Sequence, residues 1–158
     1  VKIFWIGART TSNPFAVQEI AETLYNSDTE IWIKNPIFSN LDLWFGAVER
    51  FRLNKIKKVK AIHRGFYCEN ENTYRNNPRW DLLDKFKLKY PNIPVICDPS
   101  HISGDKKLIF SISKKAIQKN INGLMIEVHH NPENALSDKK QQISPKQFNE
   151  LLEKLNLK

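Results

Sequence analysis

The chain lacks a long hydrophobic run and an N-terminal targeting pattern. No apolar stretch approaches the roughly 20 residues that a membrane-spanning helix requires, and no signal-peptide pattern opens the sequence. These absences argue against the common membrane and secreted classes, and we expect a cytoplasmic protein with no membrane partner.

Cysteine and glycine are also scarce. The two cysteines, Cys68 and Cys97, match no zinc-binding spacing and indicate free thiols in an intracellular setting. Cys97 lies in an apolar segment and is predicted to be a core residue. None of the five glycines builds a glycine-rich fingerprint after a predicted strand, which argues against a dinucleotide-binding fold.

Acidic residues are outnumbered. The chain has 25 Lys and Arg against 17 Asp and Glu, a net charge of +8. The lysines are scattered among Asn and Ile instead of gathering with aromatics, so we expect no nucleic-acid partner. The positive field still favours the approach of phosphorylated substrates. A hydrophobic content of 41% is typical of a globular protein.

Short apolar runs alternate with longer amphipathic segments. Strands are predicted at Val1–Ile6, Glu30–Ile33, Val59–Ile62, Pro94–Cys97 and Gly123–Ile126. Helices are predicted at Pro14–Tyr25, Leu41–Leu53, Arg79–Lys89, Lys106–Asn120 and Pro145–Leu155, with a long, mobile loop at Glu69–Asn77. Continuous apolar strands are typical of a parallel sheet covered by helices. The order fits a doubly wound sheet or part of a (β/α)8 barrel, and periodicity does not choose between them.

Polar residues gather directly after each predicted strand. The five strand ends lead into Gly7-Ala8-Arg9, Lys34-Asn35, His63-Arg64-Gly65, Asp98-Pro99-Ser100-His101 and Glu127-Val128-His129. In parallel α/β folds this rim is where ligands bind, because the loops and helix N-termini converge there. The pattern therefore predicts a binding site at the carboxyl ends of the strands.

Two chemical groups separate within this rim. Arg9, Lys34 and Arg64 are cations suited to a substrate with a phosphate and a carboxylate, although snorkelling surface cations are the alternative. The second group, His101, Glu127 and Asp138, could bind a divalent metal (Mn, Fe, Co or Zn). On chemistry alone, a purely structural interpretation is favoured, with His101 as a turn residue and Asp138 as a surface carboxylate. His63, His129 and His130 are weaker ligand candidates.

Six segments in this order resemble class I 3-deoxy-D-arabino-heptulosonate-7-phosphate (DAHP) synthases, in particular the bacterial branch often fused to chorismate mutase. They are IGARTT (6–11), IKNP (33–36), IHRG (62–65), CDPSH (97–101), GLMIE (123–127) and ALSD (135–138). The resemblance implies an α/β fold, a (β/α)8 TIM barrel. This chain would supply about the last five βα units, as the C-terminal part (1–158) of one barrel domain.

The resemblance also implies substrate roles. The reaction is the condensation of phosphoenolpyruvate with erythrose 4-phosphate in the shikimate pathway of aromatic biosynthesis. Arg9, the Ala8 amide and Arg64 would hold the phosphate of phosphoenolpyruvate, Lys34 would contact its carboxylate, and Asp98 would lie near erythrose 4-phosphate. Lys34 is accordingly expected to be catalytic.

The resemblance implies a metal role as well. His101, Glu127 and Asp138 would bind the metal, which makes His101 catalytic. The metal would polarise the aldehyde of erythrose 4-phosphate as a Lewis acid.

Some family features are absent from the chain. The family's metal-binding cysteine on the first strand and its Lys-Pro-Arg-Thr segment on the second are missing, and neither Cys68 nor Cys97 replaces the cysteine. Because Val1 already begins a predicted strand, we expect a fragment that needs the N-terminal half of the barrel as a partner. A homo-oligomer is expected, and fused chorismate mutase helices would begin after Lys158. The alternatives are a 3-deoxy-manno-octulosonate 8-phosphate synthase and an inactive barrel fragment serving as an interaction module.

Overall fold

The computed structural model describes residues 1–157. The predicted domain covers residues 1–158, and its last residue, Lys158, lies outside the described residues. Within this part of the chain, five strands form one parallel sheet in sequence order. The strands are β1 (Ile3–Ile6), β2 (Glu30–Lys34), β3 (Lys58–His63), β4 (Val95–Cys97) and β5 (Gly123–Leu124). Sequential parallel neighbours joined by helices are typical of a barrel wall and unlike a doubly wound sheet, whose strand order reverses.

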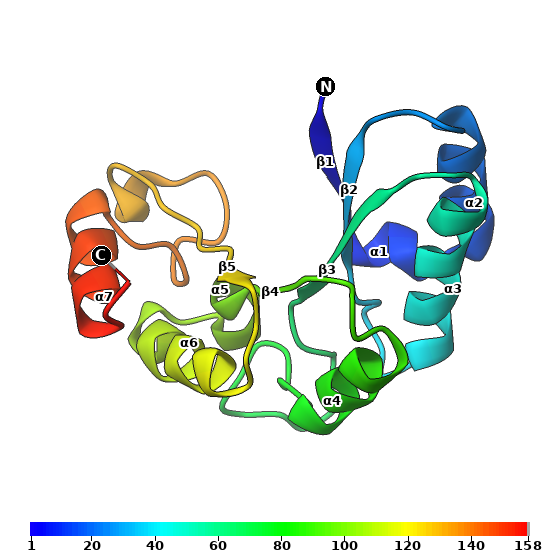
Figure 1. Cartoon of the computed structure of the whole chain (residues 1–158). Coiled ribbons are helices and arrows are strands. Elements are labelled where there is room, and N and C mark those ends of the chain that lie inside the picture. Colours follow the sequence, from blue (N-terminus) through cyan, green and yellow to red (C-terminus); the bar gives the residue numbers. More distant parts are fainter. Residues whose placement is uncertain (158) are drawn as a thin grey trace.

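Helices follow each of the strands. They are α1 (Ala8–Thr11), α2 (Pro14–Thr23), α3 (Leu41–Leu53), α4 (Trp80–Lys89), α5 (Pro99–Ser103), α6 (Ile109–Gln118) and α7 (Pro145–Lys154), with 3-10 turns η1 (Lys106–Leu108) and η2 (Pro132–Asn134). Figure 1 shows the sheet as an open arc, with α2, α3, α4 and α6 along its convex outside and the concave side uncovered.

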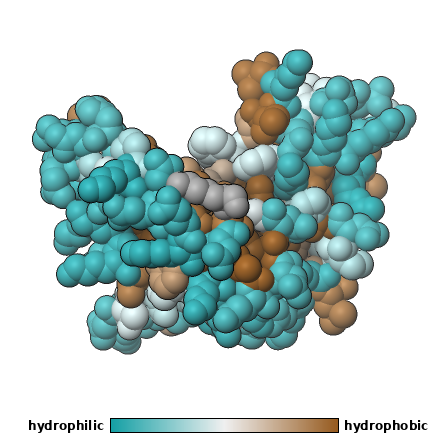
Figure 2. Space-filling model, turned by 60° about the vertical axis from the view of Figure 1, so that its left-hand side comes forward, coloured by the Kyte–Doolittle hydropathy of each residue, from teal (hydrophilic) through white to brown (hydrophobic). Residues whose placement is uncertain are grey.

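The main core lies between the convex face and the helices. Ile31 and Ile33 of β2 are fully buried there against Trp44 of α3, whose indole Nε1 donates to the Ile33 carbonyl at 3.1 Å. On β1 the alternate side chains point the other way, and Ile3 and Trp5 are 52% and 59% exposed. Figure 2 shows hydrophobic residues on this projecting strand. The concave face of the described residues is therefore a barrel interior open to solvent.

The predicted helix starts are confirmed. Asn13 caps α2 by accepting hydrogen bonds from Phe15 and Ala16, and Ser144 forms a capping box with Gln147 at the start of α7. In both cases Pro follows the cap, and its fixed φ suits the first helical position.

Several predicted boundaries are wrong by one or two residues, and three matter here. The helix predicted at Lys106–Asn120 begins with the 3-10 turn η1, so the α-helix itself starts at Ile109. β1 starts at Ile3, two residues later than predicted. β5 ends at Leu124 instead of Ile126 because the chain turns toward α5, where the Glu127 amide donates to Ser100 Oγ at 3.0 Å.

No helix within residues 1–157 combines the length and apolar character needed to cross a membrane.

Candidate functional site

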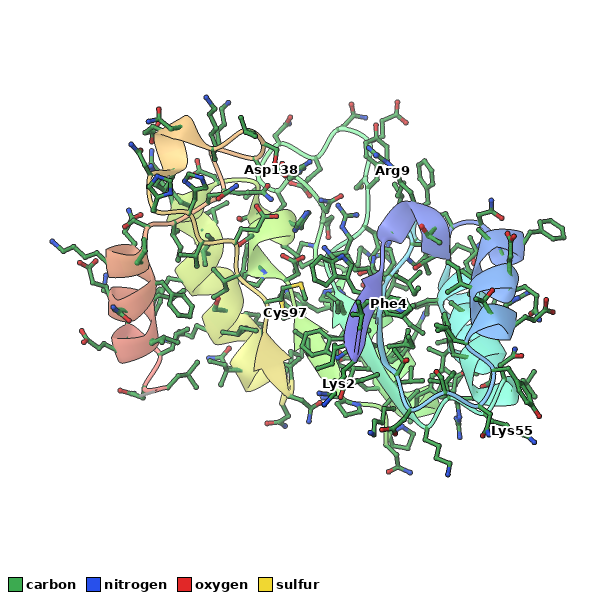
Figure 3. All side chains as sticks on the ribbon, turned by 90° about the horizontal axis from the view of Figure 1, so that it is seen from above. Lys2, Phe4, Arg9, Lys55, Cys97 and Asp138 are labelled. Atoms are coloured by element: carbon green, nitrogen blue, oxygen red, sulfur yellow. The ribbon has the colours of Figure 1, made fainter. Side chains whose placement is uncertain are left out.

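The carboxyl ends of the strands surround a cavity of about 610 Å³. Predicted site residues from the ends of β1 to β4 and from the loop after η2 line it: Ala8, Arg9, Lys34, Arg64, His101 and Asp138. Figure 3 shows Arg9 and Asp138 at the same end of the sheet, opposite Lys55. The parallel register explains this convergence, since every strand points its carboxyl end toward the same rim.

Arg64 is the most unusual cation of this cavity. It follows β3 directly and is only 8% exposed, and its Nη1 has no hydrogen-bond partner among the described residues. Burial lowers the pKa of its guanidinium to about 10, so the group stays charged at neutral pH. A buried cation without a partner is costly, and a bound anion would satisfy it.

Asn35 fixes the backbone beside this guanidinium. Its side-chain oxygen accepts a hydrogen bond from the Arg64 amide at 2.7 Å, and its Nδ2 donates to the Gly65 carbonyl at 2.7 Å. Asn35 is fully buried. It therefore locks the end of β3 to the end of β2 and sets the direction in which Arg64 leaves the sheet.

Asp98 connects the cations to the histidine. Its Oδ2 accepts a hydrogen bond from Lys34 Nζ at 3.1 Å, and His101 Nδ1 lies 2.8 Å from the same oxygen. The direction of this second contact leaves Nδ1 without a well-aligned hydrogen bond. Burial alone would raise the pKa of Asp98, but the close contact with His101 and the charges of His101 and Lys34 outweigh it, and the pKa is lowered.

Asp98 also caps α5, because its Oδ1 accepts from the His101 amide at 3.0 Å. The side chain is 1% exposed, and Asp98 is not among the residues that line the cavity. Its predicted position near erythrose 4-phosphate stays a prediction, and its observed contacts are with Lys34 and His101.

His101, Glu127 and Asp138 form a cluster able to hold a metal ion. One ligand atom from each lies within 4.8 Å of the others, and His101 Nε2 is 3.4 Å from Glu127 Oε1. Asp138 lies in the loop after η2 and adopts a positive φ of 55°. One nitrogen and two carboxylate donors fit Mn, Fe, Co or Zn.

This cluster has a second layer that the strand-end pattern did not reveal. Arg75 Nη1 contacts Asp138 Oδ1 at 2.5 Å and Gln141 Oε1 at 2.7 Å, and Gln141 Nε2 donates to Glu127 Oε2 at 3.1 Å. Arg75 and Gln141 lie in loops, many residues along the sequence from the end of the preceding strand. Sequence spacing therefore gave no signal for either residue.

The remaining histidines and the cysteines lie outside this cluster. His63 is fully buried, and burial lowers its pKa to about 4. His129 accepts the Asn131 amide through Nδ1 at 3.0 Å. Cys97 is buried as predicted, which raises the pKa of its thiol, and Cys68 is exposed.

An arc of five parallel βα units, with cations and a His–Glu–Asp cluster able to hold a metal ion at its strand carboxyl ends, defines a barrel-type α/β segment. The sequence model of the DAHP synthetase I family matches residues 1–157. The chain belongs to this family, as its motifs indicated.

Similar proteins agree with this assignment. The chain is 39% identical over 153 residues to a phospho-2-dehydro-3-deoxyheptonate aldolase of Thermotoga maritima, covering 97% of this chain and 44% of the relative. It is also 39% identical over 120 residues to a 2-dehydro-3-deoxyphosphooctonate aldolase of Desulfotalea psychrophila, covering 69% of this chain and 41% of the relative. The chain thus spans less than half the length of these curated relatives.

Solved structures confirm the fold. The crystal structure of a T. maritima phospho-2-dehydro-3-deoxyheptonate aldolase (DAHP synthase) matches with a TM-score of 0.86 at 27% identity, over 99% of this chain and 45% of that one. A truncated form of 3-deoxy-D-arabino-heptulosonate 7-phosphate synthase from T. maritima gives the same score and identity, over 99% and 58%. The predicted (β/α)8 barrel segment with five βα units is confirmed.

Proposed function

We propose that this chain forms the phosphoenolpyruvate- and metal-binding part of a DAHP synthase, which joins phosphoenolpyruvate to erythrose 4-phosphate and releases phosphate. Family membership and the names of the T. maritima proteins support this activity. The observation that carries the proposal is the single cavity lined by His101 and Asp138 of the metal cluster together with buried Arg64, whose Nη1 has no hydrogen-bond partner among the described residues.

The cations of the cavity suit phosphoenolpyruvate. Arg64 and Arg9, with the Ala8 amide at the start of α1, would hold the phosphate, since a guanidinium presents donors matched to phosphate oxygens. Lys34 would contact the carboxylate. Its ammonium has three donors, and the hydrogen bond to Asp98 uses one of them.

The metal cluster suits the aldehyde substrate. His101 Nε2, Glu127 and Asp138 would hold the divalent ion, while Asp98 orients the imidazole from its Nδ1 side. The bound ion would supply Lewis acidity toward the aldehyde oxygen of erythrose 4-phosphate. C3 of phosphoenolpyruvate then bonds to the aldehyde carbon, water adds at C2, and phosphate leaves from C2.

During this reaction the cations keep their places. Arg9 and Arg64 offset the charge of the phosphate before and after its C–O bond breaks, and Lys34 fixes the carboxylate end of the substrate. Positioning of this kind lowers the activation barrier because C3 of phosphoenolpyruvate is already held close to the aldehyde carbon.

The partners of the chain follow from the open sheet. The sheet of the described residues has five strands, and a closed barrel of this type has eight. We propose that further βα units close the barrel and supply the remaining contacts with erythrose 4-phosphate. Self-association and a linked chorismate mutase domain stay expectations from the family resemblance.

A second candidate is supported by the D. psychrophila relative, whose name describes an octonate product. Phosphoenolpyruvate contributes three carbons, so an eight-carbon acid needs a five-carbon aldose phosphate in place of the four-carbon erythrose 4-phosphate. The length of the aldehyde substrate therefore distinguishes the two functions.

The test is a substrate comparison on the full-length protein. Phosphoenolpyruvate consumption and phosphate release are followed with erythrose 4-phosphate or with arabinose 5-phosphate, before and after treatment with a chelator. We expect turnover with the four-carbon aldehyde and its loss on chelation. Preference for the five-carbon aldehyde would support the second candidate, and no consumption with either would support an inactive interaction module.

A control pair of variants links the assay to the cavity. Arg64→Met is expected to raise the KM for phosphoenolpyruvate, because a buried guanidinium that pairs with the phosphate is lost. Arg52→Met removes an exposed arginine of α3 that does not line the cavity, and it is expected to leave the KM unchanged.

A further inference from the structure

The loop between β3 and α4 is anchored along its second half, although the sequence predicted a long, mobile loop. Asn77 pairs with Phe66 in an isolated antiparallel bridge. The Arg75 amide donates to the Ser103 carbonyl at 3.2 Å, and the Asn76 amide donates to the Ile102 carbonyl at 3.1 Å. These backbone contacts dock Arg75 and Asn76 against α5, the helix that carries His101.

Asn76 adds a side-chain contact to the same helix. Its Nδ2 donates to the carbonyl of His101 itself at 2.7 Å, and Asn76 is 5% exposed. The loop therefore touches the backbone of a metal-cluster residue directly.

Two glycines permit this close approach. A Cβ on Gly104 would lie 2.6 Å from Cβ of Arg75, and a Cβ on Gly65 would lie 2.6 Å from the Asn76 carbonyl oxygen. Both glycines have a positive φ, 65° and 75° respectively. The backbone at both places is shaped so that the Arg75–Asn76 segment can sit against α5.

The Arg75 side chain then reaches both carboxylates of the metal cluster. It pairs with Asp138 directly and with Glu127 through Gln141, which is 1% exposed and has each end of its amide engaged. Two carboxylates held near one another repel, and a cation between them offsets that repulsion. Each carboxylate has a second oxygen that Arg75 and Gln141 leave free for a metal.

We propose that Arg75 is a positioning residue for the metal: through Asp138 and through Gln141 it holds the two carboxylates in the metal-binding arrangement. This inference rests on the proposed metal-dependent function. It completes a layer in which every member of the cluster has its own supporting group, Asp98 for His101, Gln141 for Glu127 and Arg75 for Asp138. Supporting groups of this kind orient the ligands of a metal site.

The partial exposure of the Arg75–Asp138 pair allows an effect on metal binding to be distinguished from an effect on folding stability. The side chains of Arg75 and Asp138 are 47% and 28% exposed, and ion pairs at such sites add little to the free energy of folding. Removing Arg75 should therefore leave the fold intact and act on metal affinity. The competing idea is that Arg75 blocks Asp138, in which case its removal would strengthen metal binding.

The test measures the affinity of the full-length protein for Mn²⁺, with free Mn²⁺ detected by electron paramagnetic resonance and no turnover required. Arg75→Met is expected to weaken Mn²⁺ binding by about 10–100-fold, the range for loss of a supporting contact. Arg75→Lys keeps the positive charge without the planar, two-pronged guanidinium, and it should recover part of the lost Mn²⁺ affinity. Arg79→Met is the matched control, because Arg79 forms a similarly exposed pair with Asp81 and should leave the affinity unchanged.

The outcomes separate this inference from the proposed function. Wild-type binding that Arg75→Met leaves unchanged or strengthens overturns the positioning role while the proposed function stands. Wild-type protein that binds no Mn²⁺ overturns both. A matching loss in Arg75→Met and Gln141→Met, with thermal melts of the metal-free variants close to wild type, supports the positioning role because an unfolded site would shift the melt as well.

Discussion

Replacing Asp98 by Asn should destabilise the protein strongly, because it removes the charge that balances Lys34. Both side chains are buried, at 1% and 10% exposure, and their atoms lie 3.1 Å apart. Loss of one partner from a buried ion pair costs about 3–5 kcal/mol, because the other charge stays desolvated without compensation. Lys34 keeps slight solvent contact, so we expect the free energy of unfolding to fall by about 3 kcal/mol, the lower end of this range.

The asparagine keeps an oxygen that can accept the His101 amide, so the cap of α5 survives and the effect isolates the charge. The assay is urea unfolding of the full-length protein followed by circular dichroism. Adding Lys34→Met to Asp98→Asn should recover much of the loss, since no unpaired charge then remains. Asp28→Asn is the control, because Asp28 pairs with Lys58 at the surface with its side chain 90% exposed, and its midpoint should not move.

The reasoning is refuted if Asp98→Asn unfolds at the wild-type urea concentration. It is also refuted if the free energy of unfolding of the double variant falls by the full sum of the decreases in the two single variants, because the two charges would then not be coupled.

Three further predictions address other parts of the site. Arg64→Met should raise the KM for phosphoenolpyruvate by about 10–100-fold, from about 1.5–3 kcal/mol for a charged hydrogen bond, and steady-state kinetics with an unchanged KM would contradict it. His63 has a pKa lowered to about 4, so between about pH 4 and 6.5 the unfolded chain binds more protons than the folded one, and the free energy of unfolding falls as the pH is lowered. Lowering the pH from 7 to 5 should cost about 2 kcal/mol through this group, and a His63→Leu variant with the wild-type pH slope in urea unfolding would refute it. Gly65→Ala should destabilise the protein by about 1–3 kcal/mol, because its φ is 75° and the new Cβ would meet the Asn76 carbonyl. Gly7→Ala meets nothing within 4 Å and serves as the control in the same thermal melts.

The strand ends and the main helices could be predicted because their signals are local. Continuous apolar runs such as the one around Ile31 and Ile33 indicated parallel strands, and Asn13 and Ser144 marked helix starts through capping chemistry. The placement of Lys34 and Arg64 at one rim followed from the parallel order alone.

Contacts that depend on loop geometry could not be predicted. Arg75 reaches Asp138 across 63 residues of sequence, and it does so because two glycines let its loop dock on α5. Likewise, nothing in the sequence around Asp98 distinguishes a substrate contact from a buried partner of Lys34 and His101. Short strands such as β5 are also set by tertiary contacts, which override the local apolar pattern.

The most direct test of the proposed site is the position of a metal in crystals of the full-length protein grown with Mn²⁺ and phosphoenolpyruvate. The predicted result is an anomalous manganese peak coordinated by His101, Glu127 and Asp138, with the substrate phosphate on Arg64. A manganese peak at other residues, or a phosphate that leaves Arg64 without a partner, would contradict the proposed site.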